Sequence, residues 1–121
     1  MMEGKIILVV EDERNIVELV SEVLADEGYQ VMTARDGQEG LDRVAETVPD
    51  LILSDVMMPV LDGRAMGRAL QSDPVYQDIP LVLMSAVSEN ALDAEDLSYH
   101  AFLSKPFELD TLVETINRLV V

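Results

Sequence analysis

Two kinds of segment alternate along the chain. Short runs of apolar, often β-branched residues occupy positions 5–10, 30–34, 51–54, 81–84 and 101–104. Most of these runs are apolar throughout rather than alternating with polar residues, which is typical of strands in a parallel sheet that is covered on both faces. The runs therefore predict the strands of a buried parallel sheet.

The segments between these runs carry apolar residues at helical spacing. The recurring positions are Ile16, Leu19, Val20, Val23 and Leu24, then Leu41, Val44, Ala45 and Val48, and finally Leu109, Leu112, Val113, Ile116 and Val120. Gly28 ends the first of these helices, and Asp36 with Glu39 forms a capping-box-like start to the second. Strands that alternate with helices over short connections predict a doubly wound open α/β sheet, in a single domain spanning residues 1–121.

The segment 88–100 fits this alternation poorly. Only Leu92 and Leu97 are large aliphatic residues there, and the acidic run 93–96 has no apolar stripe. A helix without an apolar face gains little from tertiary packing. We therefore expect the fourth helix to be short or mobile.

Composition narrows the class of protein. The chain has 24 acidic and 8 basic residues, and a formal charge of −16 repels both a nucleic-acid backbone and an anionic membrane, so we expect neither as a direct partner. The lack of cysteine excludes disulfides and thiolate metal sites, and a single histidine argues against a histidine-based zinc site. The apolar run 6–10 is too short for a signal-peptide core or a membrane span, so we expect a cytoplasmic protein.

Polar groups follow four of the predicted strands. Glu11 and Asp12 follow the first strand, Asp55 the third, Ser85 the fourth and Lys105 the fifth. Ligands of open α/β sheets bind beyond the carboxyl ends of the strands, so we expect these groups to share one crevice. Two carboxylates about 4 Å apart repel by roughly 4 kcal/mol at an effective dielectric constant of about 20, so a trio of them needs a cation nearby.

Magnesium suits this set of groups, because Mg²⁺ prefers one or two carboxylates, waters and phosphate oxygens. A carboxylate such as Asp55 can attack phosphorus to form an acyl phosphate, while Mg²⁺ and Lys105 stabilise charge on the transferred oxygens. Ser85 can donate a hydrogen bond to the new phosphoryl group. Taken singly, Glu11 and Asp12 are equally explained as acids at a helix start, and Lys105 as a surface lysine. Together, these residues favour a Mg²⁺-dependent phosphoacceptor.

The segment 55–63, DVMMPVLDG, resembles the phosphoacceptor signature of response-regulator receiver domains, the CheY-like family of two-component signalling. It stands with the segments 11–12 (ED), 85–86 (SA) and 105–107 (KPF) in the order in which the family carries these motifs, and the resemblance covers essentially the whole chain. The resemblance implies a flavodoxin-like fold with a five-stranded parallel sheet of order 2-1-3-4-5 and helices on both faces.

The resemblance also implies a role for each residue of the metal site. Asp55 is implied to be the phosphoacceptor, and Asp12 and Asp55 are implied to bind Mg²⁺ directly. Glu11 is implied to act through a water molecule. The backbone carbonyl of Met57 is implied to be the remaining protein ligand.

Other positions carry the implied switch. Ser85 and Lys105 are implied to bind the phosphoryl oxygens, and the Lys105-Pro106 bond is implied to be cis. Phe102 occupies the place of the family's switch aromatic, although an aromatic in the last strand is equally explained as core. Ser85 stands where threonine is more usual, and the segment 99–101 (YHA) stands where a Gly-Ala pair is common.

We therefore expect a signalling switch of a two-component phosphorelay rather than an enzyme with turnover. A histidine kinase or phosphotransfer protein would phosphorylate Asp55, and changed protein contacts would carry the signal to a downstream protein. Met57 and Val87 are expected near the path of an attacking water, and neither side chain can hydrogen-bond it, so we predict slow self-dephosphorylation.

Several alternatives stay open at this point. One choice is between a stand-alone receiver and a receiver excised from a hybrid kinase or a longer regulator. A pseudo-receiver would bind partners without phosphorylation. An aspartate-nucleophile phosphatase also uses an α/β sheet and Mg²⁺, but such enzymes carry a second acid two residues after the nucleophile, where this chain has Met57.

Overall fold

The computed structural model describes residues 4–92 and 94–120, in which short strands and helices alternate. The elements are β1 (Ile6–Val10), α1 (Arg14–Asp26), β2 (Gln30–Ala34), α2 (Gly37–Glu46), β3 (Leu51–Asp55), α3 (Gly63–Gln71), β4 (Leu81–Ser85), a 3-10 helix η1 (Glu89–Ala91), β5 (Ala101–Ser104) and α4 (Leu109–Leu119). The predicted strands agree with the observed ones to within one residue at each end. The alternation of apolar runs and helical patterns therefore placed the strands correctly.

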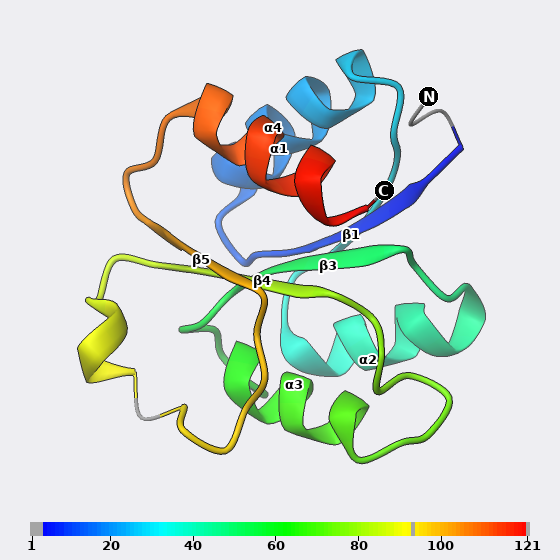
Figure 1. The fold of residues 1–121 in the computed structure, drawn as a ribbon, viewed down its shortest axis with the longest axis vertical. Coiled ribbons are helices and arrows are strands. Elements are labelled where there is room, and N and C mark those ends of the chain that lie inside the picture. Colours follow the sequence, from blue (N-terminus) through cyan, green and yellow to red (C-terminus); the bar gives the residue numbers. More distant parts are fainter. Residues whose placement is uncertain (1–3, 93, 121) are drawn as a thin grey trace.

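The five strands form one parallel sheet of order β2-β1-β3-β4-β5, which confirms the predicted topology. Val10 at the end of β1 pairs with Ser54 of β3, and Asp55 at the end of β3 pairs with Met84 of β4. Ser85 at the end of β4 pairs with Ser104 of β5. These registers bring the carboxyl ends of the strands together along one edge, at the left in Figure 1.

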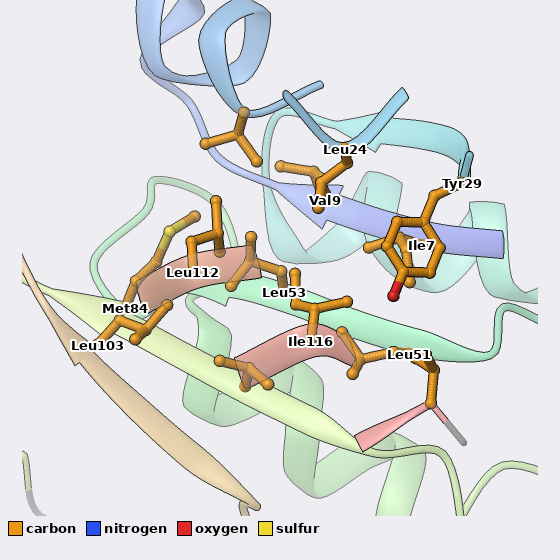
Figure 2. Close-up of a cluster of buried hydrophobic side chains, with 13 residues drawn as sticks. Ile7, Val9, Leu24, Tyr29, Leu51, Leu53, Met84, Leu103, Leu112 and Ile116 are labelled. Carbon is orange, nitrogen blue, oxygen red and sulfur yellow. The ribbon is translucent and has the colours of Figure 1, made fainter. Parts of the chain in front are cut away.

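Helices cover both faces of the sheet, α1 and α4 on one face and α2 and α3 on the other (Figure 1). Between α1, α4 and the sheet lies a cluster of buried side chains that includes Leu24, Leu53 and Leu112 (Figure 2). A second cluster, which includes Val44 and Met66, fills the space between the sheet and the helices α2 and α3. Burial on both faces explains why the strands are apolar throughout.

The predicted helix boundaries have clear physical causes. Asp36 caps α2 by accepting a hydrogen bond from the Glu39 backbone N–H at 2.8 Å, as the capping-box pattern predicted. Gly28 follows the end of α1 with a φ of 95°, a left-handed conformation that glycine adopts without strain. Asp62 caps α3 in the same way as Asp36 caps α2, through the Ala65 N–H at 2.9 Å.

The segment 88–100 lies where a fourth long helix would be. In the part of it that the structure describes, which excludes Asp93, the only helix is η1, so the expectation of a short helix is confirmed. Side chains of α3 hold this segment in place. Arg68 forms an ion pair with Asp96 at 2.9 Å, and Gln71 Oε1 accepts from the Ser98 backbone N–H at 3.0 Å. Leu97 is buried against α3, where a Cβ on Gly67 would lie 2.8 Å from its Cδ1 atom.

His100 also anchors this connection. The residue is exposed, but its Nδ1 atom accepts a hydrogen bond from the Leu81 backbone N–H at 3.1 Å. The His100 backbone N–H in turn donates to the Leu81 carbonyl at 2.8 Å. His100 therefore joins the start of β4 to the start of β5.

Candidate functional site

The sheet places the predicted site residues at one edge. Glu11 and Asp12 follow β1 directly, Asp55 is the last residue of β3, and Ser85 is the last residue of β4. Lys105 follows β5 and donates its backbone N–H to the Ser85 carbonyl at 2.8 Å. The strand-end reasoning from the sequence thus located these groups correctly in the fold.

The carboxylates of Glu11, Asp12 and Asp55 converge. Each offers one oxygen atom, and these oxygens all lie within 4.8 Å of one another. Glu11 and Asp55 are buried, with 1% and 6% of their surface exposed, whereas Asp12 is exposed at the mouth of the site. An oxygen-only donor set of this size can hold a hard divalent cation such as Mg²⁺.

Lys105 supplies positive charge within the same cluster. Its Nζ atom lies 2.6 Å from Glu11 Oε1 and 3.4 Å from Asp55 Oδ2. The other carboxylate oxygen of Glu11 accepts from the Glu13 backbone N–H at 3.0 Å. The ammonium group is therefore shared between two acids, and the shorter contact is the one to Glu11.

Burial and charge shift the protonation equilibria of this pair. Burial raises the pKa of Glu11, and the nearby charge of Asp55 adds to this effect, against the hydrogen bonds from Lys105 and from the Glu13 N–H. Burial lowers the pKa of Lys105, but its hydrogen bond to Glu11 and the charges of Asp55 and Glu11 outweigh burial and raise this pKa overall. The site therefore holds an excess of negative charge that favours a cation.

The loop between β3 and α3 folds back beneath Asp55. The Gly63 N–H donates to the Val56 carbonyl at 2.9 Å, and a Cβ on Gly63 would lie only 2.3 Å from the Asp55 carbonyl oxygen. The Ser54 hydroxyl donates to the same Asp55 carbonyl at 2.8 Å. These contacts fix the backbone at Asp55, and they explain the glycine at the end of the segment 55–63.

The remaining predicted residues surround this cluster at different depths. Ser85 is buried, and its hydroxyl oxygen accepts from the Val87 backbone N–H at 3.0 Å. Met57 and Val87 are exposed apolar residues, with 56% and 40% of their surface accessible. Phe102 is half-buried and packs against the second core cluster, and the Lys105-Pro106 peptide bond is cis, as the resemblance implied.

Comparison with known proteins identifies the family. The model of the response regulator receiver domain family matches residues 7–117. The chain belongs to this family. The match covers all of the sheet after Ile6 and all of the acidic cluster, so the candidate site lies within the matched receiver domain.

Individual receiver proteins agree with this assignment. The chain is 38% identical over 117 residues to "Response regulator MprA" of Mycolicibacterium vanbaalenii, an alignment that covers 94% of this chain and 49% of that protein. It is 35% identical over 117 residues to "Hybrid signal transduction histidine kinase D" of Dictyostelium discoideum, covering 95% of this chain and 8% of that protein. The chain spans about half the length of the first curated relatives it matches.

A solved structure extends the similarity to three dimensions. The chemotaxis response regulator CheY4 of Vibrio cholerae superposes with a TM-score of 0.88 and is 32% identical, covering 95% of this chain and 98% of that one. No helix in the described part of the chain is long and apolar enough to cross a membrane. The fold predicted from the sequence is therefore that of the receiver family.

Two residues beside the site were missed at the level of sequence. Arg14, the first residue of α1, and Arg35, which follows β2, line a hollow together with Glu11 and Asp12. The rule that ligands bind beyond strand ends was applied to the other strands, whose ends carry groups with obvious metal or phosphate chemistry. Applied to β2 as well, the same rule would have drawn attention to Arg35.

Proposed function

We propose that this chain is the phosphoacceptor switch of a two-component phosphorelay, in which Asp55 receives a phosphoryl group. One observation carries the proposal: carboxylates from the ends of two different strands converge within 4.8 Å of one another, beside an ammonium group that contacts two of them. Such an arrangement suits phosphoryl transfer, in which catalysis consists mainly of positioning and charge stabilisation.

The proposed reaction transfers the phosphoryl group from a histidine of the donor to Asp55. A carboxylate oxygen of Asp55 forms the new O–P bond, the P–N bond of the donor breaks, and its electron pair remains on the imidazole nitrogen. Lys105 Nζ, 3.4 Å from Asp55 Oδ2, places positive charge next to the transferred oxygens. The Ser85 hydroxyl already accepts from the Val87 N–H, so its own proton is available to a phosphoryl oxygen.

The residues present fit Mg²⁺ as the cofactor. Asp12 and Asp55 would hold the ion directly, Glu11 would act through water, and the Met57 carbonyl would complete the protein ligands. When bound, Mg²⁺ supplies positive charge that offsets the carboxylates and the oxygens in transfer. The single positive charge of Lys105 does not neutralise the three carboxylates of the cluster.

Signalling would follow from the new charge. A phosphoryl group adds about 1.5 to 2 negative charges, which biases a two-state rearrangement of the surrounding loops. Ser85 and Phe102 are the proposed switch residues: Ser85 holds the loop at Val87, and Phe102 is only half-buried on β5. The downstream partner would read the resulting change of surface.

The proposed donor is a histidine kinase or a phosphotransfer protein. A hollow of about 360 Å³ lies beside the site, and its lining includes Ile16 and Leu19 of α1, Phe107 and Lys105. Its mainly apolar lining next to Lys105 supports docking of the donor protein near α1. Since the relatives named above include a hybrid kinase and a response regulator, this function applies whether the receiver stands alone or forms part of a longer protein.

The test is to incubate the protein with acetyl phosphate, with and without Mg²⁺, and to measure its intact mass. We expect one added phosphoryl group on the parent chain and on Asp78→Asn, a change at an exposed residue away from the site, and none on Asp55→Asn. Omitting Mg²⁺ should strongly reduce the modification. An unmodified parent chain would instead indicate a pseudo-receiver, and turnover of a phosphate ester that is lost in Asp55→Asn would indicate a phosphatase.

A further inference from the structure

Two arginines border the acidic side of the site. A hollow of about 280 Å³ lies where α1 starts and β2 ends, and its lining includes Glu11, Asp12, Arg14 and Arg35. Arg14 begins α1, and Arg35 directly follows Ala34, the last residue of β2. Two arginines from different elements therefore line the space next to the proposed magnesium ligands.

Positive charge is scarce in this chain, so each basic residue beside the site matters to an incoming anion. The sequence has only 8 basic residues against 24 acidic ones. Lys105 contacts Glu11 and Asp55, and Arg14 and Arg35 line the adjoining hollow, so three of the eight basic residues lie in or directly beside the acidic cluster.

Both arginines are free enough to meet an incoming ligand. Arg14 pairs with Glu18 at 3.3 Å and Arg35 pairs with Glu39 at 3.4 Å, each through Nε and each four residues along the chain. The arginine side chains are 90% and 80% exposed in these pairs. Exposed pairs of this kind contribute little to stability, so exchanging the glutamate for another anion costs little.

The donor's phosphoryl group needs such help. It is an anion, and it must approach a chain with a formal charge of −16 at a pocket built from carboxylates. Positive groups at the rim of a cleft raise the encounter rate of anionic ligands, and the effect declines as salt is added. The same groups disfavour a cation at the neighbouring acids, so they act with opposite sign on the donor and on Mg²⁺.

We propose that Arg14 and Arg35 are positioning residues that attract the phosphoryl group of the donor and favour a dianionic donor over a monoanionic one. The inference rests on the proposed function. It adds that this chain selects its phosphodonor by charge. Neither arginine takes part in bond making or breaking.

The test uses the full chain with Arg14→Gln, Arg35→Gln and both changes combined. Arg118→Gln is the matched control, because it removes the same charge from an exposed position in the last turn of α4 that does not line the hollow. The initial rate of phosphorylation is measured at saturating Mg²⁺ with acetyl phosphate, a dianion, and with phosphoramidate, a monoanion. Mg²⁺ affinity is measured separately by titration without a phosphodonor.

We expect the double variant to lose about five- to tenfold in rate with acetyl phosphate at low salt, and clearly less with phosphoramidate. The loss should largely disappear at about 0.5 M salt, where charges are screened over a few ångströms. Mg²⁺ affinity should rise about two- to threefold in the same variant, because two repelling charges are gone. Arg118→Gln should behave like the parent chain in all of these measurements.

Three results would overturn the inference. The first is a double variant that matches Arg118→Gln in rate. The second is a double variant that loses both rate and Mg²⁺ affinity, which indicates structural damage. The third is a double variant whose rate falls equally with both donors. A parent chain that takes up no phosphate from either donor would refute the proposed function itself. A parent chain that is phosphorylated on Asp55 but indifferent to the arginine changes would refute only the role of Arg14 and Arg35.

Discussion

At the scale of single residues, Lys105 has two roles: it stabilises the buried charge of Glu11, and it takes part in the proposed phosphoryl transfer. The sequence suggested Lys105 as a counter-charge for the whole acid cluster, and the structure gives its shorter contact, 2.6 Å, to Glu11. The side chain of Glu11 is only 1% exposed, so without the ammonium its charge would be buried and uncompensated. Lys105 therefore supports the pocket in addition to its proposed contact with the phosphoryl group.

The residues flanking Asp55 predict the lifetime of its phosphoryl group. Met57 and Val87 are exposed and offer no hydrogen-bonding side chain to an attacking water. We expect the isolated, phosphorylated protein to keep its label for minutes or longer, and Met57→Asn to shorten this lifetime roughly several-fold by orienting the water. The decay of the phosphorylated mass after removal of the donor measures both. A parent lifetime of seconds would contradict the prediction.

Val60 predicts a gain in stability. It lies in the loop between β3 and α3 with a φ of 67° and 82% of its surface exposed. A left-handed conformation costs an L-residue roughly 1–2 kcal/mol, whereas asparagine tolerates it. We expect Val60→Asn to raise the free energy of unfolding in urea by about 0.5–1 kcal/mol.

The control for this prediction is Val75→Asn. Val75 is 72% exposed and is not among the residues with a positive φ, so the same substitution should leave stability nearly unchanged. Equal effects at the two positions would show that the backbone at Val60 is not strained.

At the scale of elements, the start of α3 determines how Asp55 is held. Asp62 caps the helix, and Gly63 allows its first turn to lie against the end of β3. Both residues belong to the segment 55–63 that carried the resemblance. Their positions give that motif a physical basis, because the helix start and the proposed phosphoacceptor are in backbone contact.

Replacing Gly63 should therefore damage both stability and the site. A Cβ at this position would lie 2.3 Å from the Asp55 carbonyl oxygen, which is main chain and cannot rotate away. We expect Gly63→Ala to lower the free energy of unfolding by about 1–3 kcal/mol and to slow phosphorylation of Asp55. Gly40→Ala is the control, since its Cβ would meet the flexible Met66 side chain at Sδ, 2.6 Å away. A smaller loss for Gly63→Ala than for Gly40→Ala would contradict the close-contact explanation.

Asp62 predicts a pH dependence of stability. Burial raises the pKa of Asp62, but hydrogen bonds from the Ala65 N–H and from Arg64 outweigh burial and hold this pKa below its usual value. A lowered pKa in the folded state stabilises the protein above the unfolded-state pKa of about 3.9, and this contribution is lost as pH falls through the folded pKa. We expect the parent chain to be more stable than Asp62→Asn at pH 6, with the difference shrinking as pH falls below about 4 and vanishing only below the lowered folded pKa.

A second variant separates the charge of Asp62 from its capping role. Asparagine keeps an oxygen that can accept from the Ala65 N–H, whereas Asp62→Ala removes the cap and should lose about 1 kcal/mol more than Asp62→Asn. Urea unfolding curves of the three proteins across pH measure both effects. A difference between the parent and Asp62→Asn that persists unchanged at low pH would contradict the pKa argument.

At the scale of the whole molecule, the sequence was sufficient for the fold because each apolar run needs cover on both faces. Parallel strands and alternating helices meet that need in few ways, and strand order followed from the family resemblance. The segment 88–100 was less predictable because its contacts are non-local. Arg68 and Gln71 of α3 hold residues about 27 positions away, and no local pattern around Asp96 or Ser98 announces them.

The candidate site was predictable to a similar degree, and for a related reason. Strand ends converge in a parallel sheet, so Glu11, Asp12, Asp55 and Lys105 were brought together by topology alone. How Lys105 divides its contacts between Glu11 and Asp55 depends on side-chain burial, which the sequence does not determine. The roles of Ser85, Met57 and Phe102 stay predictions.

The central claim is that Asp55 is the residue that accepts the phosphoryl group, and its chemical identification is the most direct test. After incubation with acetyl phosphate and Mg²⁺, borohydride reduces an aspartyl phosphate to homoserine, and peptide mass spectrometry locates the change. We predict homoserine at position 55, formed only when both the donor and Mg²⁺ were present. Homoserine at Asp12 or at another acid, or no homoserine in a protein whose mass shows phosphorylation, would contradict the claim.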